Sequence, residues 1–142
     1  MNKKISNPSV HNIDIFNEST ALIFSELYKN FPVPVYLNYE SLTKKLFKDH
    51  DSVTRENNLD VLINTISWLK TSGYIWLDSE SEMEVYGVVL SQKGLEVLKI
   101  IPTPSKNNSS IGEILAEIHG QTTHEERAKL INLAISEGSK LT

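Results

Sequence analysis

The stretch from Asp51 to Leu98 constrains the fold of this chain more than any other part of the sequence. It begins with apolar residues that recur at intervals of three and four, namely Leu59, Leu62, Ile63, Ile66 and Leu69. Residues with this spacing share one face of a helix, and such a face packs against a core. Gly73 follows the last of them and can end the helix in the left-handed conformation. The pattern predicts one long amphipathic helix.

The residues after Gly73 predict a hairpin and a short helix. Positions 74–77 read Tyr-Ile-Trp-Leu, a β-branched and aromatic run typical of a strand. Positions 78–82 form a polar, acidic turn, and 85–90 form the expected partner strand. Ser91 can cap a helix that carries Leu95 and Leu98. The predicted order is therefore helix, strand, turn, strand and helix.

Two motifs in this stretch resemble those of winged helix-turn-helix proteins, especially bacterial regulators. Residues 68–75, Trp-Leu-Lys-Thr-Ser-Gly-Tyr-Ile, are similar to the leucine, glycine, tyrosine and isoleucine exit of a winged-helix recognition helix. Residues 90–95, Leu-Ser-Gln-Lys-Gly-Leu, are similar to the leucine-threonine-x-lysine-glycine step that leaves the wing. The resemblance implies an α+β fold, a winged helix-turn-helix domain with a C-terminal helical extension.

The preceding residues are expected to complete this domain. Residues 1–13 are predicted to be a loosely held arm, followed by a helix that Asn17 or Ser19 caps and that ends near Asn30. Prolines at 32 and 34 disfavour a helix, so 33–37 is predicted to be extended, and Asn38 can cap a second helix. The winged helix-turn-helix domain is thus expected to cover residues 1–102.

The C-terminal part is predicted to be a helical pair. The composition of residues 103–110 is that of a linker. Residues 111–142 then carry one apolar helical stripe and, at 123–126, a capping box before a last helix. This last helix has apolar residues on two sides, so it is expected to pack against two surfaces. Winged-helix regulators commonly dimerise through flanking helices, and the resemblance implies a homodimer through this pair.

Composition argues against several classes of function. The chain of 142 residues has no cysteine, which excludes disulfides and thiolate metal sites. No apolar run approaches the roughly 20 residues of a spanning helix, and the N-terminus has no apolar secretory segment. We therefore expect a cytoplasmic protein without a membrane partner.

The sequence also lacks the patterns of common catalytic and metal sites. It contains no glycine-rich phosphate loop, no nucleophile elbow and no paired-carboxylate pattern. His119 and His124 lie near Glu125 and Glu126, but their spacing matches no helical zinc motif. We expect a protein that is not an enzyme and that has no cofactor and no metal.

Double-stranded DNA is the partner that the resemblance implies. The start of the predicted recognition helix would enter the major groove, and lysines of the preceding helix would contact phosphates. These candidates are Lys44, Lys45, Lys48, Ser52, Thr54, Arg55, Asn57 and Asn58. However, residues 49–86 carry eight acidic residues against Arg55 and Lys70, in a chain whose net charge is −4. Because phosphate neutralisation supplies most non-specific affinity, this charge opposes DNA binding.

A protein partner is the alternative. Off the main leucine stripe, the long helix and the following strand carry an apolar set that consists of Val61, Thr65, Trp68 and Trp76. Exposed patches that contain tryptophan mark interfaces, whereas the C-terminal helices or the arm could also cover these residues. Two functions remain open, namely a DNA-binding transcriptional regulator and a winged helix that binds protein through an acidic wing.

Overall fold

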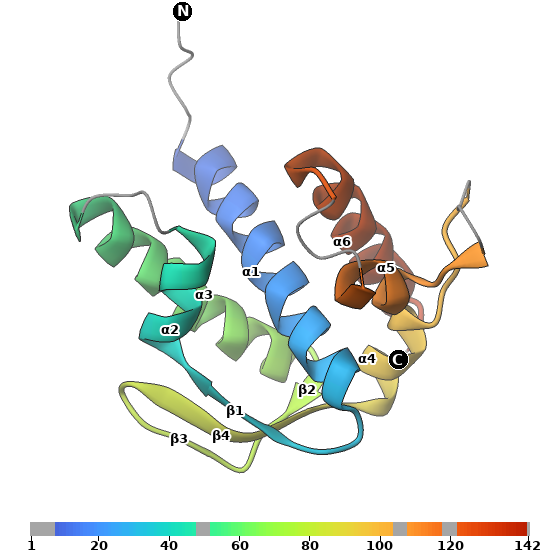
Figure 1. The fold of residues 1–142 in the computed structure, drawn as a ribbon, viewed down its shortest axis with the longest axis horizontal. Coiled ribbons are helices and arrows are strands. Elements are labelled where there is room, and N and C mark those ends of the chain that lie inside the picture. The colour runs from blue at the N-terminus through green and yellow to red at the C-terminus, as the bar shows by residue number, and fades with distance from the viewer. Residues whose placement is uncertain (1–7, 48–51, 104–107, 118–121, 142) are drawn as a thin grey trace, which may run out of the picture.

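A computed structural model of the chain describes residues 8–47, 52–103, 108–117 and 122–141. The elements in these ranges are α1 (Pro8–Asn30), β1 (Val35–Asn38), α2 (Tyr39–Leu46), α3 (Ser52–Thr71), β2 (Ile75–Trp76), β3 (Ser79–Glu80), β4 (Glu84–Leu90), α4 (Gln92–Leu98), α5 (Ile111–Glu117) and α6 (His124–Gly138). The fold is α+β, as predicted. Figure 1 shows α1 at the centre, between α2 and α3 on one side and α5 and α6 on the other, with the strands below. Within the described ranges, no helix is both long and apolar enough to cross a membrane.

The central helix α1 begins earlier than the sequence predicted. It starts at Pro8, and proline is favoured in the first turn of a helix because its missing N–H is not needed there. The predicted cap at Asn17 or Ser19 is therefore wrong, and both side chains are buried in the middle of the helix. Residues 19–25 are all buried, because α3 packs against α1 from one side and α5 and α6 pack from the other. Small polar side chains at these positions allow the close approach of several helices.

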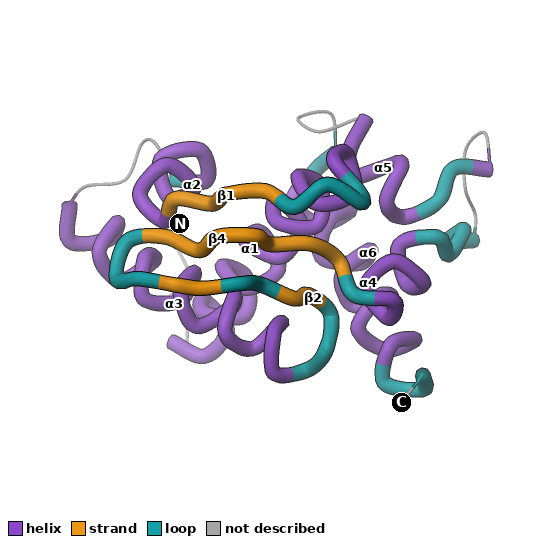
Figure 2. Tube along the Cα trace, turned by 90° about the horizontal axis from the view of Figure 1, so that it is seen from below, coloured by secondary structure: helices purple, strands orange, loops and turns teal. Residues whose placement is uncertain are grey.

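The strands form one small antiparallel sheet with β4 in the centre. β1 pairs with β4 along one edge, while β2 and β3 pair with β4 along the other. Figure 2 shows β1, β4 and the segment that carries β2 and β3 side by side, with the helices behind them. Leu37, Ile75, Val85, Val88 and Leu90 are buried on the side that faces the helices. The other side of the sheet is not covered by any element that the structure describes.

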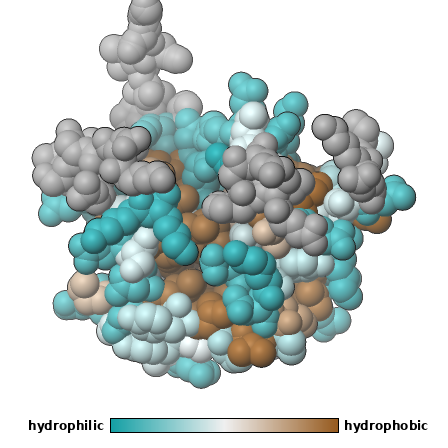
Figure 3. Space-filling model, in the orientation of Figure 1, coloured by the Kyte–Doolittle hydropathy of each residue, from teal (hydrophilic) through white to brown (hydrophobic). Residues whose placement is uncertain are grey.

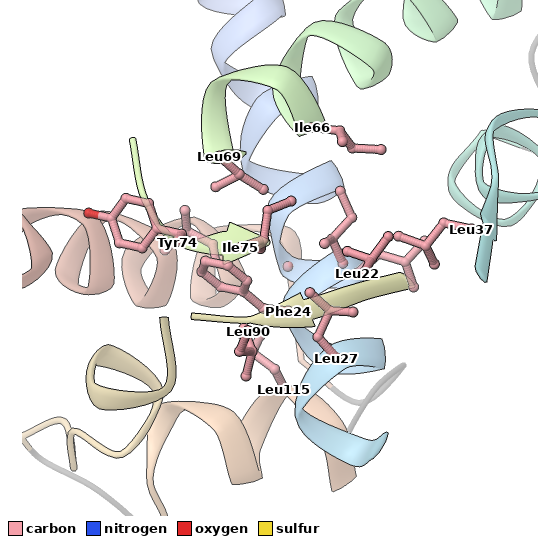
Figure 4. Close-up of a cluster of buried hydrophobic side chains, with 14 of the residues drawn as sticks. Leu22, Phe24, Leu27, Leu37, Ile66, Leu69, Tyr74, Ile75, Leu90 and Leu115 are labelled. Atoms are coloured by element: carbon pink, nitrogen blue, oxygen red, sulfur yellow. The ribbon is translucent and has the colours of Figure 1, made fainter. Parts of the chain in front are cut away.

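The predicted C-terminal pair belongs to the same hydrophobic core as the rest of the chain. The core cluster in Figure 4 joins Phe24 and Leu27 of α1 to Leu115 of α5, and it extends to Ile131 of α6. The backbone N–H of Ile111 donates to the carbonyl oxygen of Ile100 over 2.8 Å. The boundary at 103–110 therefore does not separate two cores. α6 packs against α1, α4 and α5, so the two-sided helix finds its partners within the chain, and the homodimer stays a prediction.

The motif at residues 90–95 joins the end of α3 to α4. The Ser91 hydroxyl oxygen accepts from the Gly94 N–H over 3.0 Å and caps α4, as predicted, and it also donates to the Gly73 carbonyl. Lys93 Nζ donates to the Ser72 carbonyl over 2.9 Å and lies 4.6 Å from the centroid of the Tyr74 ring. A Cβ on Gly94 would lie 2.2 Å from the Tyr74 carbonyl oxygen, so this close approach requires glycine. Serine, lysine and glycine in this motif thus have structural roles.

Candidate interaction surface

The uncovered side of the sheet exposes three aromatic rings, and we call Tyr36, Trp76 and Tyr86 the outer sheet face. Side chains alternate between the two sides of a strand, so neighbours of buried residues point outward. The exposed fractions are 55% for Tyr36, 61% for Trp76 and 40% for Tyr86. One ring comes from each of β1, β2 and β4, and pairing brings these strands together. Figure 3 shows that hydrophobic residues also reach the surface at the lower edge of the molecule, where Figure 1 places the strands.

A β-bulge brings two of these rings into contact. The partners that define the register are Val35–Val88, Leu37–Val85 and Asn38–Glu84. Two steps along β1 thus match three steps along β4, and Tyr86 and Gly87 together oppose Tyr36. Gly87 has φ +67°, the left-handed conformation that a bulge of this kind uses. As a result, the centroids of the Tyr36 and Tyr86 rings are 5.4 Å apart, with 39° between the ring planes.

A carboxylate joins the two tyrosines. The Tyr36 hydroxyl donates to Glu84 Oε1, and the Tyr86 hydroxyl donates to Glu84 Oε2. Asn38 Nδ2 also donates to Oε1, over 3.3 Å. The hydrogen bond from Tyr36, and to a smaller extent the one from Tyr86, lower the pKa of Glu84, because they stabilise the ionised carboxylate. The same hydrogen bonds raise the pKa of each tyrosine. A negative charge is therefore held between two neutral phenols.

The hairpin that carries this carboxylate is acidic throughout, and we call Asp78, Glu80, Glu82 and Glu84 the acidic hairpin. The hairpin closes where the Ser81 N–H donates to the Glu84 carbonyl over 2.9 Å. Lys70 Nζ lies 3.6 Å from Glu80 Oε2, with both side chains about half exposed. An exposed pair of this kind contributes little stability and leaves most of the hairpin charge uncompensated.

A cavity of about 330 Å³ separates the hairpin tip from α2 and α3. Its lining combines apolar groups with three carboxylates, and the residues are Tyr39, Glu40, Thr43, Glu56, Leu59, Glu82 and Met83. The carboxylates come from three different elements, α2, α3 and the hairpin. The groove between the predicted recognition helix and the predicted wing is therefore negatively charged on each of its sides.

The structure divides the predicted partner-binding residues into exposed and buried ones. Trp76 is the most exposed of them. Trp68 is 42% exposed, with its ring against Phe16 at a centroid distance of 5.4 Å and against Tyr74 at 6.1 Å. Thr65 is buried, and its hydroxyl donates to the Val61 carbonyl over 2.7 Å. Val61 is only partly exposed. Trp68 therefore lies on the other side of the sheet from Trp76, and the four residues do not form one patch.

The structure describes the side chains of four of the eight predicted DNA-contacting residues. Lys44 and Lys45 are exposed on α2, and Lys45 Nζ lies 3.8 Å from Glu26 Oε2. Asn57 is exposed near the start of α3, whereas Asn58 is fully buried and faces the core. Asn58 therefore cannot reach a base in this conformation. Lys48 and the side chains of Ser52, Thr54 and Arg55 lie outside the described part of the chain.

The histidine in the predicted surface cluster makes a structural contact. His124 Nδ1 lies 2.6 Å from Glu18 Oε2, and Arg127 Nε donates to Glu18 Oε1 over 3.0 Å. These contacts attach the start of α6 to α1. Among the residues that the structure describes, no group of three or more potential ligands is close enough to hold a metal ion. His119 is outside those residues.

Two residues at the centre of the surface, Tyr36 and Tyr86, are absent from the sequence-based candidates, whereas Glu84 is one of the acidic residues expected in the wing. In 84–90, Glu84 and Tyr86 flank the buried Val85, and this alternation is a signal for one exposed side of that strand. The meeting of the two tyrosines across the sheet depends on the bulge, which the sequence does not reveal. Comparisons of the chain with family models, with curated proteins and with solved structures find no match. The surface is therefore interpreted from its own chemistry.

Proposed function

We propose that this chain is a non-enzymatic winged-helix regulatory module that binds a protein partner through its sheet and hairpin. The proposal rests on one observation, namely that aromatic rings from β1, β2 and β4 are exposed on the same side of the sheet, which no described element covers. Tryptophan and tyrosine dominate the binding energy of protein interfaces.

The order of the elements supports the winged-helix part of the proposal. A helix, a short strand, two helices and a hairpin follow one another, and the first strand pairs with the returning strand of the hairpin. In a winged helix the recognition helix would be α3 and the wing would be the hairpin between β2 and β4. The cavity between them is where a duplex would approach.

The charge around this cavity favours protein over DNA. Glu40, Glu56 and Glu82 line it, and Asp60 is exposed on the same half of α3. A duplex carries one negative charge about every 1.7 Å of its axis, so these carboxylates would repel it at close range. The exposed lysines of α2 oppose this repulsion only in part, since one of them has a carboxylate partner.

Site-specific photo-crosslinking tests the proposal in cells that contain the protein. A benzophenone amino acid replaces Trp76 in one variant and Ile13 in a matched control. Both positions carry a large exposed hydrophobic residue, but Ile13 lies toward the N-terminal end of α1, away from the sheet. We expect one discrete protein adduct from position 76 and none of that mass from position 13. Adducts of equal yield from both positions, or adducts to DNA from position 76, would contradict the proposal.

A further inference from the structure

The outer sheet face combines aromatic rings with a carboxylate in a way that favours a cation. The faces of aromatic rings carry partial negative charge and attract guanidinium and ammonium groups within about 6 Å. Tyr36 and Tyr86 donate hydrogen bonds to Glu84, which places a full negative charge at the edge of both rings. The Asp78 carboxylate lies beside Gly87 and adds a second negative charge, whereas Glu80 and Glu82 face α3 and α2 on the helix side of the sheet. The electrostatic complement of this face is a positively charged segment.

The hydrogen bonds of Glu84 leave room for one more donor. A carboxylate offers about four acceptor sites on its two oxygens. Oε1 accepts from the Tyr36 hydroxyl and from Asn38, whereas among the described residues Oε2 accepts from the Tyr86 hydroxyl alone. A donor on the open side of Oε2 would therefore complete the set. A planar guanidinium can donate there in a fixed geometry while its flat face stacks on a ring, and an ammonium has no flat face to stack.

The spacing of the rings decides where the cation would lie. A flat group between two rings needs about 7 Å between them, because each contact takes about 3.5 Å. The Tyr36 and Tyr86 centroids are 5.4 Å apart, so nothing can enter between them. The available surface is the outward side of the rings, and Trp76 offers a third exposed ring on the neighbouring strand. An extended segment would reach both places, because its alternate side chains point the same way.

We infer that the outer sheet face binds an extended, arginine-containing segment of a basic protein, with one guanidinium over the Tyr86 ring and hydrogen-bonded to Glu84 Oε2. The inference rests on the proposed function and names the chemistry of the partner. A second arginine of the same segment, two positions from the first, then lies on the Trp76 ring. Glu84 and the two tyrosines then form a ready-made site, since their mutual hydrogen bonds hold the carboxylate in place before the partner arrives.

A peptide titration monitored by ¹⁵N NMR tests the inference on the full chain. The probe is an acetylated Gly-Arg-Gly-Arg-Gly amide, and its control is the same peptide with citrulline, which keeps the shape and removes the charge. We expect weak binding of the arginine peptide, with shifts at residues 36, 76 and 84–87. The citrulline peptide should bind about tenfold more weakly or not at all, because it lacks both the cation–π and the charge-assisted contacts.

Matched variants separate the site from general charge attraction. Glu84→Gln and Glu125→Gln remove the same charge, but Glu125 is exposed at the start of α6, on another side of the molecule. We expect about fivefold weaker binding for Glu84→Gln, the loss of one charge-assisted hydrogen bond, and less than about twofold for Glu125→Gln. Trp76→Ala should weaken binding without altering the shifts near Tyr86.

Several results would overturn the inference. Equal effects of Glu84→Gln and Glu125→Gln would show attraction to net charge alone. Equal binding of the citrulline peptide would exclude recognition of the cation. Binding of single-stranded oligothymidylate to the same residues, strengthened by Glu84→Gln, would assign the rings to nucleic acid. If the arginine peptide fails while a discrete adduct forms at position 76, the proposed function stands and this inference does not.

Discussion

Replacement of Ile131 by alanine measures whether α6 is part of the same folding unit as α1. Ile131 is fully buried and belongs to the core cluster that also contains Phe24 and Leu27. The change removes three carbon atoms, worth about 0.8 kcal/mol each in transfer free energy. The cavity that remains adds to this, so we expect the free energy of unfolding to fall by about 3–4 kcal/mol. For a chain of this size, the melting temperature should fall by about 10 °C.

The assay is urea unfolding followed by two probes at two protein concentrations. Circular dichroism reports all helices, whereas tryptophan fluorescence reports Trp68 and Trp76, which lie on α3 and β2. If α6 shares the core, both probes of Ile131→Ala shift together and the midpoints do not depend on protein concentration. Leu141→Ala is the control, because Leu141 is half exposed and its loss should change stability by less than about 0.5 kcal/mol. If the fluorescence midpoint of Ile131→Ala equals that of the unaltered chain, or if its unfolding curve shows a second transition, α6 does not share the folding unit of α1.

Three other predictions concern the sheet and its connections. Gly87→Ala should cost about 1–2 kcal/mol in thermal unfolding, because alanine is strained at φ +67° and its Cβ would lie 2.4 Å from Asp78 Oδ2; an unchanged melting temperature would contradict the bulge. Ser91→Ala should cost about 1–2 kcal/mol in urea unfolding through loss of the α4 cap, with Ser139→Ala as a milder control. Because the pKa of Glu84 is lowered in the folded chain, its ionised form stabilises the fold at pH values above the ordinary glutamate pKa, and this stabilisation is lost as the pH falls through the pKa of the folded state. The carboxyl ¹³C signal of Glu84 should therefore titrate at lower pH than that of a glutamate in a peptide. In the Tyr36→Phe, Tyr86→Phe double variant it should titrate as in the peptide.

Periodicity and glycine placement were sufficient to predict the middle of the chain. The stripe from Leu59 to Leu69 is the buried side of α3, and Gly73 follows α3 with φ +87°, as predicted for a helix stop. The hairpin and α4 follow in the expected order. These features depend on neighbours in sequence, which a single chain reveals. The last helix has its predicted capping box at Thr123 and Glu126 for the same reason.

Features that depend on distant neighbours were not predictable. Asn17 and Ser19 have the residue types of helix caps, but α1 continues through them because helices from both halves of the chain cover it. Asn58, by contrast, lies four residues before Leu62 on the buried stripe of α3, so the helical spacing was sufficient to place it in the core. The Tyr36–Glu84–Tyr86 contact requires the bulge in β4, which shifts the register by one residue. The position of the α1 cap and the contact between the tyrosines thus depend on tertiary packing rather than on local preference.

The charge of the groove between α2, α3 and the hairpin is the central point of the account. Its most direct test is fluorescence anisotropy of a labelled mixed-sequence duplex, titrated with the intact chain at low salt and again at rising salt. We predict no binding by the intact chain at low salt, because Glu40, Glu56 and Glu82 repel phosphate there. Binding that weakens steeply with salt, and that Arg55→Ala reduces, would contradict the account and assign the chain to DNA.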